Sequence, residues 1–310
     1  VSDDFEKRFN SYGWNYVQID GHNEKQIINA LKKAQKSKIP SAISCKTIIG
    51  YGSPNKSGTA SVHGSPLGKD EVALVRKKLK WNYKPFEIPK NILDEWRKIG
   101  EKGSKDEKKW IISYNKKSKK IKDQFDRVIN NKLPDTFNKH IADLKKKIFE
   151  TKSDMATRKS SSFVIENLTN SLPELIGGSA DLSGSNNTKT KNSIIIKPSN
   201  FTGNYIHYGV REHAMAGIMN GLALHGGIIP YGGTFLIFLD YCKPSLRLSA
   251  MMGQKVIYIF SHDSIGLGED GPTHQPIEHL AHLRAIPNLN VFRPADTIET
   301  LECWEIALKS

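Results

Sequence analysis

The sequence predicts an α/β protein with doubly wound parallel sheets, helices on both faces of the sheets, and two domains joined by a helical linker. Three observations support this architecture. Strand-like apolar runs alternate with segments of helical periodicity, once near the start of the chain and again after residue 150. A lysine-rich stretch of amphipathic helices separates the two series. The length of 310 residues is enough for two ordinary domains.

The first series begins with a strand pattern over residues 15–19. A helical pattern over residues 24–36 follows, and a second strand pattern covers residues 39–46. This order predicts a parallel βαβ unit. Residues 49–67 are rich in Gly, Ser, Pro, Asn and His and are long enough for a functional loop. A helix is expected next, over residues 70–79.

Long amphipathic helices are predicted from there to about residue 149, with a break near Pro134. The second series then alternates strands with helices, which again predicts a doubly wound parallel sheet. Its predicted strands cover residues 174–179, 205–208, 228–231, 256–260 and 289–292. Its predicted helices cover residues 156–168, 212–224, 235–251 and 275–283.

The net charge of +14 raises the question of a nucleic-acid partner. The excess lies mostly between Lys102 and Lys147, where lysines alternate with acids, arginine is scarce and aromatic residues are few. A solvated connector is favoured, and no nucleic-acid partner is expected. No apolar run approaches the length of a membrane span, so no membrane partner is expected. The three cysteines have no metal-binding spacing and favour a reducing, cytoplasmic location.

The most informative segment is residues 261–275, which directly follows the apolar strand pattern. It contains two histidines, three carboxylates and three glycines. Glycines allow the backbone to approach a ligand closely. Open α/β sheets place their active sites at the carboxyl ends of strands, which is where this loop begins.

This segment resembles the corresponding stretch of the transketolase family. Three further regions resemble that family in the same order: residues 46–53 with 63–67, residues 177–182, and residues 208–213. The similarity covers nearly the whole chain and is weakest in the lysine-rich stretch. It implies the thiamine-diphosphate-binding fold and transfer of a two-carbon ketol unit between sugar phosphates.

The resemblance implies three regions: 1–100 as the C-terminal part of the diphosphate-binding domain, 101–150 as the linker, and 151–310 as a pyrimidine-binding domain incomplete at its C-terminus. Family members bind Mg²⁺ or Ca²⁺ through a Gly-Asp-Gly motif, which is absent here. The metal ligands and a third domain are therefore expected outside these residues. A homodimer with active sites at the subunit interface is also expected, and the 310 residues alone are expected to be inactive.

Glu212 is the first candidate for chemistry, because thiamine catalysis needs a carboxyl group on a nitrogen of the cofactor's aminopyrimidine ring. A glutamate in the first turn of a helix is equally an ordinary dipole partner, and chemistry alone leaves both interpretations open. The resemblance implies the catalytic one.

Phe235, Phe238 and Tyr241 recur at helical spacing, and spacing alone favours core packing. The resemblance instead implies that these aromatic rings form the aminopyrimidine pocket, with Ile49 on the thiazolium side.

The resemblance also implies the sugar-phosphate contacts. Arg158, Ser185 and His262 correspond to phosphate-binding residues of the family, and Asp270 to the carboxylate that reads a sugar hydroxyl. His63, His262 and His274 are expected to act near the reacting oxygens, and imidazoles exchange protons near neutral pH. His63 is also expected at the cofactor, and Asp181 beside it.

Three alternatives remain open. Dihydroxyacetone synthase and deoxyxylulose-phosphate synthase use the same cofactor, and the phosphate-binding matches argue against the second. A non-catalytic basic binding fragment is the third, and the retained group of acidic residues and histidines argues against it.

Overall fold

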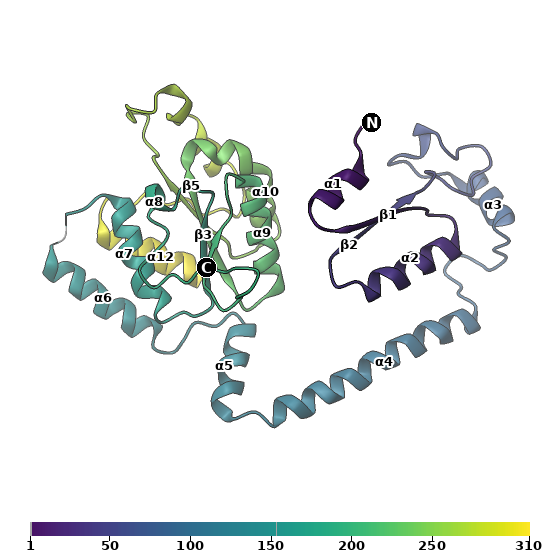
Figure 1. Ribbon diagram of the computed structural model, residues 1–310, viewed down its shortest axis with the longest axis horizontal. Helices are drawn as coiled ribbons and strands as arrows, with labels where there is room; N and C mark the ends of the chain where they lie inside the picture. Colours follow the sequence, from purple (N-terminus) through teal and green to yellow (C-terminus); the bar gives the residue numbers. More distant parts are fainter. Residues whose placement is uncertain (1, 153) are drawn as a thin grey trace. The chain divides into compact units, whose positions relative to one another are not determined.

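The computed structural model describes residues 2–152 and 154–310. The chain divides into two compact units, Val1–Lys109 and Trp110–Ser310 (Figure 1). Each unit contains a parallel sheet, which confirms the predicted fold class. Helix α4 (Lys90–Asn115) crosses the boundary between the units. Within the described ranges, no helix combines the length and apolarity that a membrane span requires.

The first unit is the predicted βαβ arrangement. Strand β1 (Asn15–Asp20) pairs in parallel with β2 (Ser41–Lys46), and α2 (Glu24–Lys36) makes the crossover. The second strand begins two residues later than predicted, because Pro40 has no N–H to donate to a ladder. Helix α3 (Lys69–Lys78) follows the loop, and a short helix α1 (Phe5–Ser11) precedes the sheet.

The second unit contains a four-stranded parallel sheet in the order β4-β3-β5-β6. The strands are β3 (Leu175–Ser179), β4 (Tyr205–His207), β5 (Ile229–Phe235) and β6 (Ile257–Ser261). Helices α6 (Phe137–Thr151), α7 (Thr157–Thr169) and α12 (Thr297–Lys309) lie on one side of it, and α9 (Glu212–His225) and α10 (Leu239–Met251) on the other (Figure 1). The shorter helices are α5 (Lys119–Ile129), α8 (Ser183–Asn186) and α11 (His279–Arg284).

The core of the second unit explains this layering. One buried cluster joins α7 and α12 to the sheet around Tyr231, and a second joins α9 and α10 around Leu239. Helix α6 contributes Phe137, Ile141 and Leu144 to the first cluster. These residues recur at helical spacing, so this part of the lysine-rich stretch packs onto the second unit through one apolar face.

Three predicted elements of the second unit also differ from the structure. Residues 289–292 do not form a strand; Leu289 and Val291 instead pack against the cluster around Leu239, which accounts for their apolar character. The predicted helix over 235–251 begins later, because Phe235 ends β5 and a 3₁₀ turn (Leu236–Phe238) precedes α10. The predicted helix over 275–283 begins only at His279, after Pro276.

Candidate active site

The candidate site lies at the carboxyl ends of the strands of the second unit. Asp181 comes two residues after β3, Phe235 ends β5, and His262 directly follows β6. The chain passes from β3 to β4 on one side and later to β5 on the other, so this end is a topological switch point. Asp181 and His262 both have left-handed backbones, with φ of 63° and 54°. Strained residues of this kind concentrate at functional sites.

Aromatic rings form one wall of the site. Phe235 and Phe238 stack with their centroids 5.6 Å apart, and Phe238 stacks on Tyr241 at 5.8 Å. Phe235 is 6% exposed and Tyr241 63% exposed, so the wall runs from the core to the surface. The three residues come from a strand, a 3₁₀ turn and a helix, which corrects the prediction of a single helix face.

Two histidines of the loop after β6 contact this wall. The His262 ring stacks on Phe235 with a centroid distance of 3.8 Å. His274 meets Phe235 and Phe238 edge-on, at 6.1 and 5.3 Å. The hydroxyl of Thr273 lies 2.9 Å from His274 Nδ1. The loop therefore folds back over the aromatic wall.

Charged side chains surround His262. Burial lowers the pKa of His262, and the positive charge of Arg158 on α7 lowers it further. The carboxylates of Asp270 and Asp263 act in the opposite direction on this pKa. Burial and the charge of Arg158 thus favour the neutral imidazole of His262, and the two carboxylates oppose them.

A buried chain of hydrogen bonds supports His262 from behind. Its Nδ1 lies 2.9 Å from the hydroxyl of Ser261, which accepts a hydrogen bond of 2.6 Å from the side-chain amide of Asn186. Ser179 donates to Asn186 Oδ1 at 3.1 Å. Sequence reasoning missed Ser179, Asn186 and Ser261. Asn186 and Ser261 could have been suspected only because they are next in sequence to the predicted site residues Ser185 and His262.

Glu212 begins α9 after the turn at Tyr208–Arg211, in which Gly209 has a φ of 73°. Its side chain is 7% exposed. Burial, and after it the negative charge of Glu212, raises the pKa of the Cys242 thiol to about 12. The Glu212 carboxylate therefore lies near Cys242, the residue after Tyr241 of the aromatic wall. Among the hydrogen bonds of the described residues, none reaches this carboxylate.

Ile49 and His63 lie in the loop of the first unit, and both are exposed. The loop is held at its start by His22, whose Nε2 accepts a hydrogen bond of 2.8 Å from the Ile48 N–H. The His22 ring also stacks on Tyr51, with centroids 3.8 Å apart. These two contacts fix the path of the chain beside Ile49.

A second anchor of this loop is the buried carboxylate of Glu71 on α3. It accepts hydrogen bonds from the Ser53 hydroxyl and from the backbone and side chain of Asn55, the last two both 2.9 Å long. The Ser53 hydrogen bond, followed by those of Asn55, lowers the pKa of Glu71 to about 2.

We expect the Glu71→Gln substitution to loosen this loop, because glutamine keeps only one acceptor oxygen and its amide nitrogen cannot accept the hydrogen bonds made to the other. The folded pKa lies below the unfolded one, so the stability from Glu71 is complete above about pH 4.5 and is lost as the pH falls towards 2. Amide hydrogen exchange at Asn55 and Lys56 checks this, with exposed Glu87→Gln as the control. Equal protection in both variants would contradict the anchor.

The structure thus brings together most of the sequence-predicted site residues, and all of these belong to the second unit. Contacts or charge effects link Arg158, Phe235, Phe238, Tyr241, His262, Asp270 and His274. Ser185 on α8 is joined to them through its neighbour Asn186, and Asp181 and Glu212 lie at ends of elements of the same unit. Ile49 and His63 belong to the first unit.

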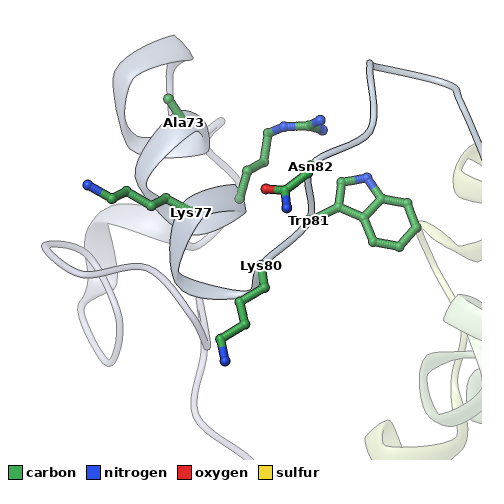
Figure 2. A pocket seen from close by; sticks show the side chains of 6 residues that line it. Ala73, Lys77, Lys80, Trp81 and Asn82 are labelled. Carbon is green, nitrogen blue, oxygen red and sulfur yellow. The ribbon is translucent and has the colours of Figure 1, made fainter.

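A surface hollow of about 460 Å³ lies at the end of α3. Its lining includes Arg76, Lys77, Lys80 and Trp81, and none of the sequence-predicted site residues. Figure 2 shows the Lys77 and Lys80 side chains extending in different directions. Their ammonium groups do not converge on one point, as an anion site would require.

His279 is buried between two exposed carboxylates. Its Nε2 lies 3.3 Å from Asp240, and its Nδ1 lies 3.9 Å from Glu278. Because the carboxylates approach different ring nitrogens, the arrangement is that of an imidazole between two acidic partners.

Two protein-family models match the chain. The transketolase pyrimidine binding domain matches residues 153–310, and the transketolase thiamine diphosphate binding domain matches residues 1–134. Among curated relatives, the transketolases of Cereibacter sphaeroides and of Buchnera aphidicola subsp. Acyrthosiphon pisum are 47% and 49% identical. Each alignment covers 99% of this chain, but only 46% and 47% of the relative. The chain thus spans about half the length of these proteins.

Solved structures agree with these matches. Transketolase from Pichia stipitis in complex with sedoheptulose-7-phosphate superposes with a TM-score of 0.89 at 38% identity, over all of this chain and 47% of that one. Transketolase from Leishmania mexicana gives 0.88 at 36% identity, over all of this chain and 46% of that one. Since one domain model alone covers half of the chain and the other covers most of the remainder, the chain belongs to the transketolase family.

Proposed function

We propose that the chain forms part of a thiamine-diphosphate-dependent transketolase. The reaction is the reversible transfer of a two-carbon ketol unit from a ketose phosphate to an aldose phosphate. The observation that carries the proposal is the convergence of His262, His274 and the aromatic wall at the carboxyl end of the sheet. The family relatives support the substrate class, because the Pichia stipitis structures include complexes with sedoheptulose-7-phosphate and xylulose-5-phosphate.

The residues of the second unit fit the aminopyrimidine part of the cofactor. When bound, thiamine diphosphate supplies the nucleophilic carbon that takes up the ketol unit. The stacked rings of Phe235, Phe238 and Tyr241 offer a flat apolar surface to a heteroaromatic ring. Glu212 is a buried residue whose carboxylate accepts no hydrogen bond from the described residues, and an N–H or protonated ring nitrogen of the cofactor can donate to it.

The proposed substrate side uses the groups around His262. Arg158, Ser185 and His262 bind the phosphate, and Arg158 can donate two N–H groups at once. Asp270 accepts a hydrogen bond from a sugar hydroxyl. His274 and His63 exchange protons with the reacting oxygens, and Ile49 and His63 contact the cofactor from the diphosphate-binding side. Asp181 holds neighbouring groups in place.

A second copy of the chain completes the proposed site, with the diphosphate-binding domain of one subunit facing the pyrimidine-binding domain of the other. Helices α9 and α10 expose Ile218, Leu248 and Met251, which suits a subunit interface. Mg²⁺ or Ca²⁺ accompanies the diphosphate to balance its charge. A cytoplasmic location fits the cysteines, because Cys45, Cys242 and Cys303 are all free thiols.

The test is an assay of the complete protein that carries this chain, with thiamine diphosphate, Mg²⁺, xylulose-5-phosphate and an aldose phosphate acceptor. We expect ketol transfer that a chelator abolishes and that added Mg²⁺ or Ca²⁺ restores. A dimer is expected by light scattering. Folded protein that binds the cofactor and leaves both sugars unchanged would refute the proposed reaction.

We expect Arg158→Ala to raise the KM for phosphorylated sugars about tenfold. Loss of a charge-assisted hydrogen bond costs roughly 1.5–3 kcal/mol, and the lower end applies because Arg158 is exposed. Steady-state kinetics with phosphorylated and unphosphorylated acceptors measure this. The neighbouring exposed Lys159→Ala removes the same charge and serves as the control. An equal effect on both classes of acceptor would argue against a phosphate contact.

A further inference from the structure

We propose that Asn186 and Ser261 are positioning residues that hold His262 in the tautomer with its proton on Nε2. The inference deepens the proposed function, since it specifies what His262 presents to the substrate. It stands on the buried chain of hydrogen bonds that ends at His262 Nδ1. None of the supporting side chains needs to touch the substrate.

The donors and acceptors of this chain of hydrogen bonds can be assigned by starting from Ser179. Its hydroxyl accepts the N–H of Leu182 at 3.0 Å, and its proton points to Asn186 Oδ1 or to the Gly233 carbonyl, both at 3.1 Å. With Oδ1 turned to this donor, the amide nitrogen of Asn186 faces Ser261, 2.6 Å away. An amide nitrogen can only donate, so Ser261 Oγ accepts there.

The hydroxyl of Ser261 therefore keeps its own proton for another acceptor. Within the described part of the chain, the only other partner of this hydroxyl is His262 Nδ1 at 2.9 Å. Donation from Ser261 makes Nδ1 the acceptor nitrogen, and the proton of a neutral imidazole then resides on Nε2. The lowered pKa of His262, caused first by burial, favours this neutral form of the ring.

The surroundings make this arrangement rigid. Ser179 and Asn186 are fully buried, and Ser261 is nearly so. The imidazole is clamped by its stack on Phe235, and its backbone is held in the left-handed region. A neutral Nε2–H donor, beside Arg158, suits an oxygen acceptor such as a phosphate or a sugar hydroxyl. The buried hydrogen bonds behind His262 therefore decide which ring nitrogen presents its proton to the substrate.

Nitrogen NMR of the ¹⁵N-histidine-labelled chain tests the tautomer without any substrate. We expect wild-type His262 to carry its proton on Nε2. Ser261→Ala removes the donor and shifts the ring towards a mixture of tautomers, whereas Ser261→Thr keeps the hydroxyl and the wild-type signals. Asn186→Asp reverses the preference, because a carboxylate takes the Ser261 proton and leaves Ser261 to accept from Nδ1–H.

The matched control is Ser249→Ala, which deletes another buried hydroxyl, one bonded to Asn220 and Tyr258. It should destabilise the chain by a comparable amount and leave the His262 signals unchanged. A wild-type ring protonated on Nδ1, or unchanged signals in folded Ser261→Ala and Asn186→Asp, would overturn the proposal.

Kinetics of the complete protein separate this inference from the proposed function. Ser261→Ala should raise the KM for a ketose phosphate roughly two- to tenfold, the value of one neutral hydrogen bond, with the affinity for thiamine diphosphate unchanged. Ser261→Thr should restore it. If the wild-type protein transfers no ketol unit while the tautomer responds to Ser261, the proposed reaction fails and the hydrogen-bond assignment stands. If transfer occurs and the tautomer ignores Ser261, the assignment alone fails.

Discussion

The Glu212→Gln substitution, made in the complete protein, is expected to leave the fold intact and to remove nearly all ketol transfer. Glutamine has almost the same shape, so the start of α9 and its packing are preserved. It lacks the negative charge that stabilises a proton on the facing ring nitrogen. General acid–base contributions of this kind are worth about 10²–10⁴ in rate, and we expect a loss of that order in kcat.

Two measurements make this expectation decisive. Thermal unfolding should give nearly the same Tm for the variant and the wild type, which separates a chemical effect from a structural one. Glu166→Gln on α7, another glutamate with restricted exposure, serves as the control and should keep its activity. Near wild-type turnover by Glu212→Gln would exclude Glu212 from the chemistry and leave its carboxylate as a helix-dipole partner.

Local patterns were sufficient to predict most of the fold. The helix over 24–36 has the predicted bounds, because an Asn23 side chain caps it and its polar and apolar residues alternate at helical period. The prediction failed at residues 289–292, where apolar character reflects packing against α10 rather than pairing in the sheet. An apolar run indicates that a segment is buried. It forms a β-strand only where a neighbouring strand is available for backbone hydrogen bonds.

The candidate site was predictable only in part. The motif matches selected Phe235, Phe238, Tyr241 and His262, and their stacked rings lie together in the structure. Asn186 and Ser261 could not be selected in the same way. They lie 75 positions apart in sequence, and their hydrogen bond exists only because β3 and β6 end at the same edge of one sheet. Support of this kind is a property of the tertiary structure.

The loop of the first unit also depends on residues that the sequence alone does not single out. The sequence predicts a functional loop over 49–67 from its composition, yet its two anchors lie outside that segment. His22 belongs to the turn after β1, and Glu71 belongs to α3. Neither residue stands out locally, since single histidines and first-turn glutamates are common. Their roles follow from the contacts that folding creates.

A large loss of stability is expected from Gly178→Ala in the central strand β3. A methyl group built there would lie 2.2 Å from the Tyr208 ring and 2.7 Å from the backbone oxygen of Ile206. The second contact is with backbone, so β4 itself has to move. Tyr208 is buried in a cluster with Met215 and Met219 of α9, and it precedes the turn that leads to Glu212.

Overpacking of this kind costs roughly 1–3 kcal/mol, and the upper end applies where backbone has to shift. For a unit of this size about 3 kcal/mol corresponds to a fall in Tm of roughly 6–12 °C. Calorimetry of the chain measures this, with Gly184→Ala as the control, because a methyl group there meets no atom within 4 Å. We expect the control to change the free energy of unfolding by less than about 0.5 kcal/mol. Equal Tm values for the two variants would mean that β4 and Tyr208 can shift without loss of stability. The segment between β3 and Glu212 would then be less tightly packed than these distances indicate.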